Sequence, residues 1–175
     1  MDIVCKIEAL FARRGGAICR DDGGNGRGVT ALAHALQCAQ LAEWAHADTA
    51  LVAAALLHDL GQLIDGAPAE APVIELHEVR ALTLLSAGGF GAAVTEPIRL
   101  HEQARRLLAE DGTPVNAQRR LCFLARPHAA QALRLSRWDM LARHPGKRTP
   151  PLAYYLNLLD DLLLMSRPQR RIALA

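Results

Sequence analysis

Aromatic residues are scarce in this 175-residue sequence, where Phe, Trp and Tyr together make up only 4%. Leu and Ala must therefore supply most of the apolar packing, and a sequence rich in them with few β-branched runs favours helix. No segment alternates apolar and polar residues in the way that a half-buried strand would. We therefore predict an all-α fold, a helical bundle that residues 1–175 form as a single domain.

The sequence also lacks an excess of one charge and a long apolar run. Its 20 basic and 18 acidic residues leave a net charge of +2, which gives no electrostatic reason to expect nucleic acid or a membrane as a partner. No apolar run approaches the roughly 18–20 residues of a membrane span. Charges interrupt the stretch MDIVCKIEALFARR, where a signal peptide would be apolar. We expect a cytoplasmic protein.

Cysteine is infrequent and unpatterned. The four cysteines are scattered without a CxxC pair, which argues against a disulfide framework and against a zinc knuckle. Cys38 and Cys122 lie among apolar residues, and we predict that both are small core residues. Trp44 and Trp138 are predicted to be core residues as well.

Glycine-rich and proline-rich segments divide the remaining sequence into helical stretches. Residues 14–28 are predicted to form a flexible loop, and residues 168–175 a tail. Asp48 and Thr95 are the expected N-caps of the third and fifth helices, and Gly61 is expected to end the third. The predicted helices cover residues 2–13, 29–45, 48–60, 73–89, 95–112, 117–124, 127–142 and 152–165.

The stretch ALVAAALLHDLGQLI, residues 50–64, places His58 and Asp59 at the end of an apolar helix. Burying both side chains without partners would cost several kcal/mol. The pattern therefore indicates either that the chain reaches the surface there or that a cation binds both side chains.

Other predicted helices carry further imidazoles and a carboxylate. His34 lies in ALAHALQCA, His77 in ELHEVRAL, His101 in IRLHEQARRLL and Asp139 in RLSRWDM. Taken singly, each histidine also fits a hydrogen-bonded core or boundary residue. His46, His128 and His144 lie at predicted helix ends or in loops and are predicted to be surface residues.

The order H…HD…H…H…D on successive helices resembles the HD-domain superfamily. This resemblance implies a metal centre, and the two histidines between the HD pair and the last Asp imply a second ion. Asp59 is the natural bridge, because the two oxygens of one carboxylate can bind two cations. The set of nitrogen and oxygen donors suits iron, manganese or zinc. One ion would be held by His34, His58 and Asp139, and the other by His77 and His101.

Longer stretches resemble one branch of this superfamily, the HD-domain oxygenases of phosphonate degradation, which are related to myo-inositol oxygenase. The resemblance covers about residues 29–158 and is most specific in TEPIRLH and in RWD…PG…TPPL. It implies a mixed-valent Fe(II)/Fe(III) centre that uses O2 to cleave the C–P bond of a small 1-hydroxyphosphonate and release phosphate. The iron at His34, His58, Asp59 and Asp139 would bind O2, and the iron at Asp59, His77 and His101 would bind the substrate.

The resemblance also suggests residues that contact the substrate. Gln62 follows HDLG where relatives carry a polar residue facing the substrate anion, and Arg105 stands where the phosphonate-cleaving members have a Lys. Arg can pair with a phosphonate through two parallel hydrogen bonds. A solvated cation on the helix surface is the alternative for Arg105.

One departure from the family pattern affects the expected substrate. The phosphonate-cleaving members carry a Tyr and a Glu before the His34 helix, and here the matching positions are Gly24 and Arg27. A cation cannot recognise the ammonium group that the Glu recognises. We therefore expect a substrate without that amine, with Arg27 as a substrate-binding residue; the alternative is a solvated Arg27 in a mobile glycine loop.

Two other functions remain open from the sequence. The first is a phosphohydrolase with Mn or Zn, in which a metal-bound hydroxide attacks a phosphate ester or nucleotide. The second is a non-catalytic binding module. Asp160 and Asp161 are rivals of Asp139 for the last ligand position, although NLLDDLLL is more simply the polar face of a terminal helix.

Overall fold

The computed structural model describes residues 2–18, 28–65, 74–109 and 114–166. These residues are mostly helical, as predicted, and their only β-type pairing is an isolated bridge between Ile18 and Thr30. None of the described helices is both long and apolar enough to cross a membrane. The helices are α1 (Ile3–Arg14), α2 (Ala31–Trp44), α3 (Thr49–Leu57), α4 (Leu60–Asp65), α5 (Ile74–Ala87), α6 (Ala92–Ala109), α7 (Pro114–Leu124), α8 (Ala129–Leu141) and α9 (Leu152–Ser166).

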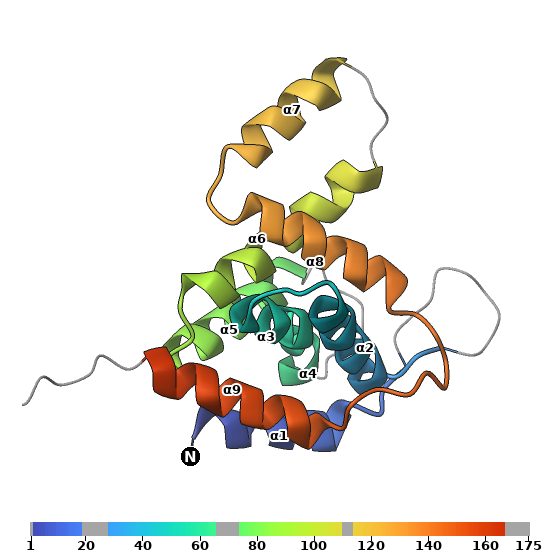
Figure 1. The fold of residues 1–175 in the computed structure, drawn as a ribbon, viewed down its shortest axis with the longest axis vertical. Helices are drawn as coiled ribbons and strands as arrows, with labels where there is room; N and C mark the ends of the chain where they lie inside the picture. The colour runs from blue at the N-terminus through green and yellow to red at the C-terminus, as the bar shows by residue number, and fades with distance from the viewer. Residues whose placement is uncertain (1, 19–27, 66–73, 110–113, 167–175) are drawn as a thin grey trace, which may run out of the picture.

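Helix α3 is the centre of the bundle. Every residue from Leu51 to Leu57 is buried, as expected for a helix that is apolar on all sides. It packs against α2, α6, α8 and α9, while α1 and α9 run side by side beneath it in Figure 1. The end of α3 therefore delivers polar side chains into the interior of the protein.

Helix α3 begins where the sequence predicts but ends earlier than predicted. The Asp48 side chain accepts a hydrogen bond from the Leu51 N–H at 2.8 Å, so the predicted cap is confirmed. The prediction that Gly61 ends this helix is wrong. The helix ends at Leu57, His58 and Asp59 form a turn, and Gly61 lies buried within the new helix α4. A glycine inside a buried helix permits close packing, and the local sequence does not distinguish such a glycine from one that ends a helix.

Helix α6 begins before the predicted cap. It starts at Ala92, so Thr95 is inside the helix and is not its N-cap. The Thr95 hydroxyl donates to the carbonyl of Gly91, four residues earlier, at 3.3 Å. The Thr95 N–H donates to the same carbonyl at 3.1 Å, so the hydroxyl shares its acceptor with the helix backbone.

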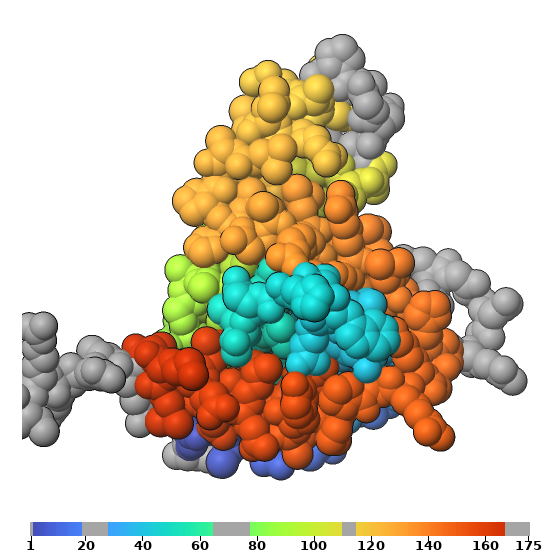
Figure 2. All heavy atoms as spheres, viewed as in Figure 1, coloured from blue at the N-terminus to red at the C-terminus, as the bar shows by residue number. Residues whose placement is uncertain are grey.

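Helix α7 projects from one end of the bundle (Figures 1 and 2). Its buried contact is Phe123, which joins a small apolar cluster with residues of α6 and α8. The adjacent Cys122 is exposed, so its prediction as a core residue is wrong. Neighbouring residues of a helix point about 100° apart, and the apolar stretch did not reveal which of the two faces inward.

The two tryptophans differ in burial. Trp138 is buried, as predicted. The prediction for Trp44 is wrong, because 63% of this residue is exposed. The Lys147 ammonium lies 4.8 Å from the centroid of the Trp44 ring, so a cation covers one face of a ring that the core does not enclose.

Candidate metal centre

Four parts of the bundle bring ligand-type side chains to one place. His34 comes from the middle of α2, His58 and Asp59 from the turn between α3 and α4, His101 from α6, and Asp139 from α8. The HD pair stands there because α3 ends at that depth in the core. Residues separated by more than a hundred positions are thus neighbours in the fold.

The donor atoms lie at the separations that a shared metal ion requires. The His34 Nε2 is 3.4 Å from the His58 Nε2 and 3.3 Å from the Asp139 Oδ1. The Asp59 Oδ2 lies 3.7 Å from the His34 Nε2 and 3.5 Å from the His58 Nε2. Metal–ligand bonds of about 2.1 Å place neighbouring ligand atoms about 3.0–3.4 Å apart and opposite ones about 4.2 Å apart.

His101 extends this cluster beside His58. The centroids of the His58 and His101 rings are 5.4 Å apart, and those of His34 and His58 are 5.3 Å apart. The Ser136 hydroxyl donates to the His101 backbone carbonyl at 2.7 Å, which ties α8 to α6 at this point. The His58 ring at the end of α3 therefore lies beside each of the other two imidazoles.

Backbone carbonyls orient all three imidazoles in the same sense. The Nδ1–H of His34 donates to the Ala142 carbonyl at 2.9 Å, that of His58 to Ala55 at 3.0 Å, and that of His101 to Ile98 at 2.6 Å. With the proton assigned to Nδ1, each Nε2 presents a lone pair. Metal-binding histidines are held in this way by a partner on the second nitrogen. This donor set fits a divalent metal ion.

Three members of the cluster are shielded from water, while Asp59 and His101 are partly exposed. His34, His58 and Asp139 are each about 5% exposed or less, whereas the Asp59 side chain is 31% exposed. Asp59 therefore stands at the open side of the cluster.

Charge within the metal-free cluster is shared between His58 and the carboxylates. Burial lowers the pKa of His58, but the charges of Asp59 and Asp139 outweigh this effect and raise it to about 9. Burial opposes ionisation of Asp139, yet hydrogen bonding with His34 and His58 holds its pKa well below the usual range. Burial and the charge of His58 lower the pKa of His101. In the metal-free protein at neutral pH, the proton on His58 thus supplies the positive charge that a metal ion would otherwise provide.

These pKa shifts predict opposite pH dependences for the metal-free and the metal-loaded protein. The raised pKa of His58 contributes stability that is complete below its ordinary pKa of 6.5 and is lost as the pH rises through about 9. The depressed pKa of Asp139 contributes stability that is lost only in acid, below its ordinary 3.8. We expect the urea midpoint of chelator-treated protein to fall between pH 6.5 and 9.5, and that of metal-loaded protein to hold or rise, because metal binding displaces the proton.

A variant without the titrating ring separates this effect from general alkaline destabilisation. His58→Gln should show a flatter profile than the unaltered metal-free protein between the same two pH values. If the metal-free protein were equally stable at both, or if His58→Gln lost as much stability, His58 would not carry the proton.

The remaining predicted site residues are distributed around this cluster. Gln62 is exposed on α4. Arg105 lies on α6 one turn after His101, with its guanidinium 3.0 Å from the Glu102 carboxylate and 43% of its side chain exposed. His77 lies in the first turns of α5, and its side chain is outside the described part of the structure. Gly24 and Arg27 lie outside the described residues.

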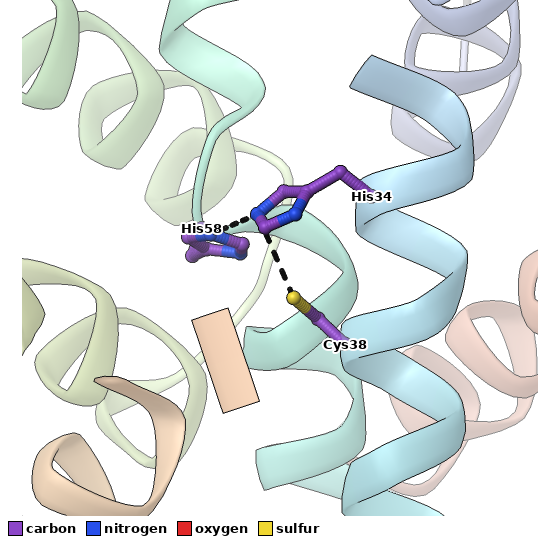
Figure 3. Close-up of side chains that lie close together, drawn as sticks. All are labelled: His34, Cys38 and His58. Atoms are coloured by element: carbon purple, nitrogen blue, oxygen red, sulfur yellow. Dashed lines mark hydrogen bonds between the residues drawn. The ribbon is translucent and has the colours of Figure 1, made fainter. Parts of the chain in front are cut away.

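Two residues near the cluster were missed by the sequence analysis. The buried Cys38 places its Sγ 3.7 Å from the His34 Nε2, as Figure 3 shows, and is more than a small core residue. Arg143 places its Nη2 3.7 Å from the Asp139 Oδ1. Each stands four positions after a candidate ligand, so the helical repeat was the signal that could have revealed both.

The other histidines and carboxylates lie away from the cluster. His46 and His144 are exposed, and His128 is partly exposed where α8 begins. Asp160 and Asp161 are exposed on α9. Asp139, and not this acidic pair, is the carboxylate that meets the histidines.

A model of the HD domain matches residues 31–165, a range that contains every member of the cluster. The chain therefore belongs to the HD-domain family, as its H…HD…H…H…D pattern predicted. It is also 35% identical, over 158 residues, to a hydroxymethylphosphonate dioxygenase of Gimesia maris. That alignment covers 77% of this chain and 78% of the relative.

Proposed function

We propose that this protein is a diiron oxygenase that uses O2 to cleave the C–P bond of a small 1-hydroxyphosphonate, with release of phosphate. The observation that carries the proposal is the convergence of three imidazoles and two carboxylates in a chain 35% identical to a hydroxymethylphosphonate dioxygenase. Imidazole nitrogens and carboxylate oxygens are the ligands of non-haem iron oxygenases.

The cluster divides naturally between two ions. His34, His58 and Asp139 would hold one iron, His101 and His77 would hold the other, and Asp59 would bridge them. When bound, iron supplies the redox chemistry that an organic substrate needs to react with O2. The protein's part is to leave ligand positions open on the exposed side of Asp59 and to keep the opposite side dry.

Arg105 is the candidate for binding the phosphonate anion. Burial lowers its pKa, but its hydrogen bond to Glu102 and the charges of Asp139 and Asp59 raise it overall, so the guanidinium senses both cluster carboxylates. Glu102 holds the side chain one helical turn from His101. A guanidinium in this position can pair with two phosphonate oxygens while the substrate hydroxyl approaches the metal centre.

The expected substrate is small and carries no amine. This expectation came from Arg27, which replaces the Glu of amine-recognising relatives. The substrate in the Gimesia maris protein's name agrees with it, because hydroxymethylphosphonate has one carbon, a hydroxyl and a phosphonate but no amine. We propose hydroxymethylphosphonate as the first compound to test, and Gln62 and Arg27 as further substrate contacts.

The proposal predicts O2-dependent release of phosphate. If both atoms of O2 enter the products, hydroxymethylphosphonate and O2 give formate and phosphate in equal amounts, with one new oxygen on each fragment. Protein loaded with Fe(II) without oxygen should release phosphate only after O2 is admitted. An oxygen electrode and a phosphate assay, read on the same sample, should give equal amounts of O2 consumed and phosphate formed.

The same samples test the phosphohydrolase alternative. Protein loaded with Mn(II) or Zn(II) is incubated without oxygen with a phosphate ester such as p-nitrophenyl phosphate. Phosphate release that proceeds equally well with and without O2 would reject the oxygenase and favour the hydrolase.

A further inference from the structure

Cys38 lies in the metal cluster and is not accounted for by the proposed iron ligands. It follows His34 by one turn of α2, is fully buried, and its Sγ is 3.7 Å from the His34 Nε2. The ligand atoms of His34, Cys38 and His58 all lie within 4.8 Å of one another. Figure 3 shows the thiol and the two rings pointing toward one another from α2 and the end of α3.

Two of the separations among these atoms match a tetrahedral zinc site. With Zn–N bonds of about 2.0–2.1 Å and a Zn–S bond of about 2.3 Å, tetrahedral angles place two nitrogens about 3.4 Å apart and nitrogen and sulfur about 3.6 Å apart. The His34 and His58 Nε2 atoms are 3.4 Å apart, and the Sγ is 3.7 Å from the first of them. Asp139 Oδ1 lies 3.3 Å from the His34 Nε2 and 3.9 Å from the His58 Nε2, so it would complete the set as a fourth ligand after a small shift toward His58.

The chemistry of the thiol selects a particular class of ion. A thiolate is a soft ligand that favours Zn²⁺ over the harder ions that carboxylates and water suit. The thiol loses its proton to solvent as the sulfur–metal bond forms. The positive charge of the bound ion then balances the negative charges of the thiolate and the neighbouring carboxylates.

We propose that the cluster can bind Zn²⁺ in an alternative tetrahedral site that includes a thiolate, with the ligands His34, Cys38, His58 and Asp139. Co²⁺ would bind the same site as a spectroscopic substitute. This ion uses three ligands of the proposed oxygenase centre and therefore excludes iron from it. Cys38 makes the protein sensitive to inactivation by zinc. The inhibitory consequence rests on the proposed function, whereas the binding site itself does not.

Cobalt spectroscopy tests the site without any activity measurement. Metal-free protein titrated with Co²⁺ should develop an intense near-ultraviolet band from thiolate-to-cobalt charge transfer, together with the strong visible bands of tetrahedral cobalt. Cys38→Ser should still bind Co²⁺ through the imidazoles and carboxylates but should lack the charge-transfer band. Unfolding midpoints of the metal-free proteins establish that the variant is folded.

A matched variant removes the other thiols. With Cys5, Cys19 and Cys122 all changed to Ser, Cys38 is the sole sulfhydryl, and the band should persist with the intensity of one thiolate per bound cobalt. This arm decides the question even if Cys38→Ser does not fold. Absence of the band in the triple variant, or its persistence in Cys38→Ser, would overturn the proposal.

Zinc competition separates this proposal from the proposed function. In the active iron-loaded protein, Cys38→Ser should raise the zinc concentration needed for half-inhibition by at least about tenfold, the loss that even an outer partner of a metal site causes. If the protein has no oxygenase activity but shows the cobalt band, the function is wrong and the thiolate site stands. If it is an active oxygenase without the band, the reverse holds.

Discussion

Replacing Asp59 with Ala is expected to remove both metal ions from the protein and to abolish turnover. The Asp59 carboxylate lies 3.5–3.7 Å from the Nε2 atoms of His58 and His34, and it is the most exposed member of the cluster. Its two oxygens make it the bridging candidate, so its loss weakens both sites together. Metal analysis of Fe(II)-loaded protein after desalting should fall from two ions per chain to less than one.

A second carboxylate variant provides the control for this experiment. Asp160→Ala removes an exposed carboxylate of α9 and should retain both ions and full turnover. Asp59 is not the bridge if Asp59→Ala keeps two ions per chain. Loss of a single ion would assign Asp59 to one site only.

Replacing His101 with Ala is expected to remove one ion and leave the other. The His101 ring lies beside that of His58, with the two centroids 5.4 Å apart, and under the proposed function His101 belongs to the second site alone. The ion held by His34, His58 and Asp139 should remain. O2-dependent phosphate release should fall by at least about 100-fold, since loss of a ligand exceeds the effect of losing its outer partner.

His144→Ala is the matched control, because this exposed histidine contacts Gln37 through its backbone and not through its ring. It should keep both ions and normal turnover. If His101→Ala keeps full O2-dependent turnover, the diiron proposal fails. A protein that needs only the His34, His58 and Asp139 ion would then be a mononuclear enzyme.

The helices were predictable because their signals are local. Asp48 caps α3 through a contact with the third residue after it, and such a bond depends on the sequence around it alone. Thr95 and Gly61 carry the same local signals, yet the structure uses both inside helices. What decides these positions is packing against distant elements, which no short window contains. The exposed Trp44 was misjudged for the same reason.

The members of the metal cluster were predictable from their order along the chain, but their neighbours were not. His34 and Asp139 stand more than a hundred residues apart, and only the family pattern linked them before the fold was known. Cys38 and Arg143 belong to no such pattern. Their positions follow from the helical repeat once the ligands are assigned, so they become visible only in a second reading of the sequence.

The carbonyls of Ala142, Ala55 and Ile98 give the cluster an unusual kind of genetic robustness. In many metal proteins a side-chain carboxylate orients each imidazole, and one codon change can remove it. Here the orienting atoms belong to the main chain, so any side chain that fits the buried positions 55, 98 and 142 would leave them in place. Alanine scanning would thus identify the ligand side chains but not the backbone carbonyls that orient them. Selection can retune these imidazoles only by moving the ends of α3 and α8 or the turn of α6 before His101.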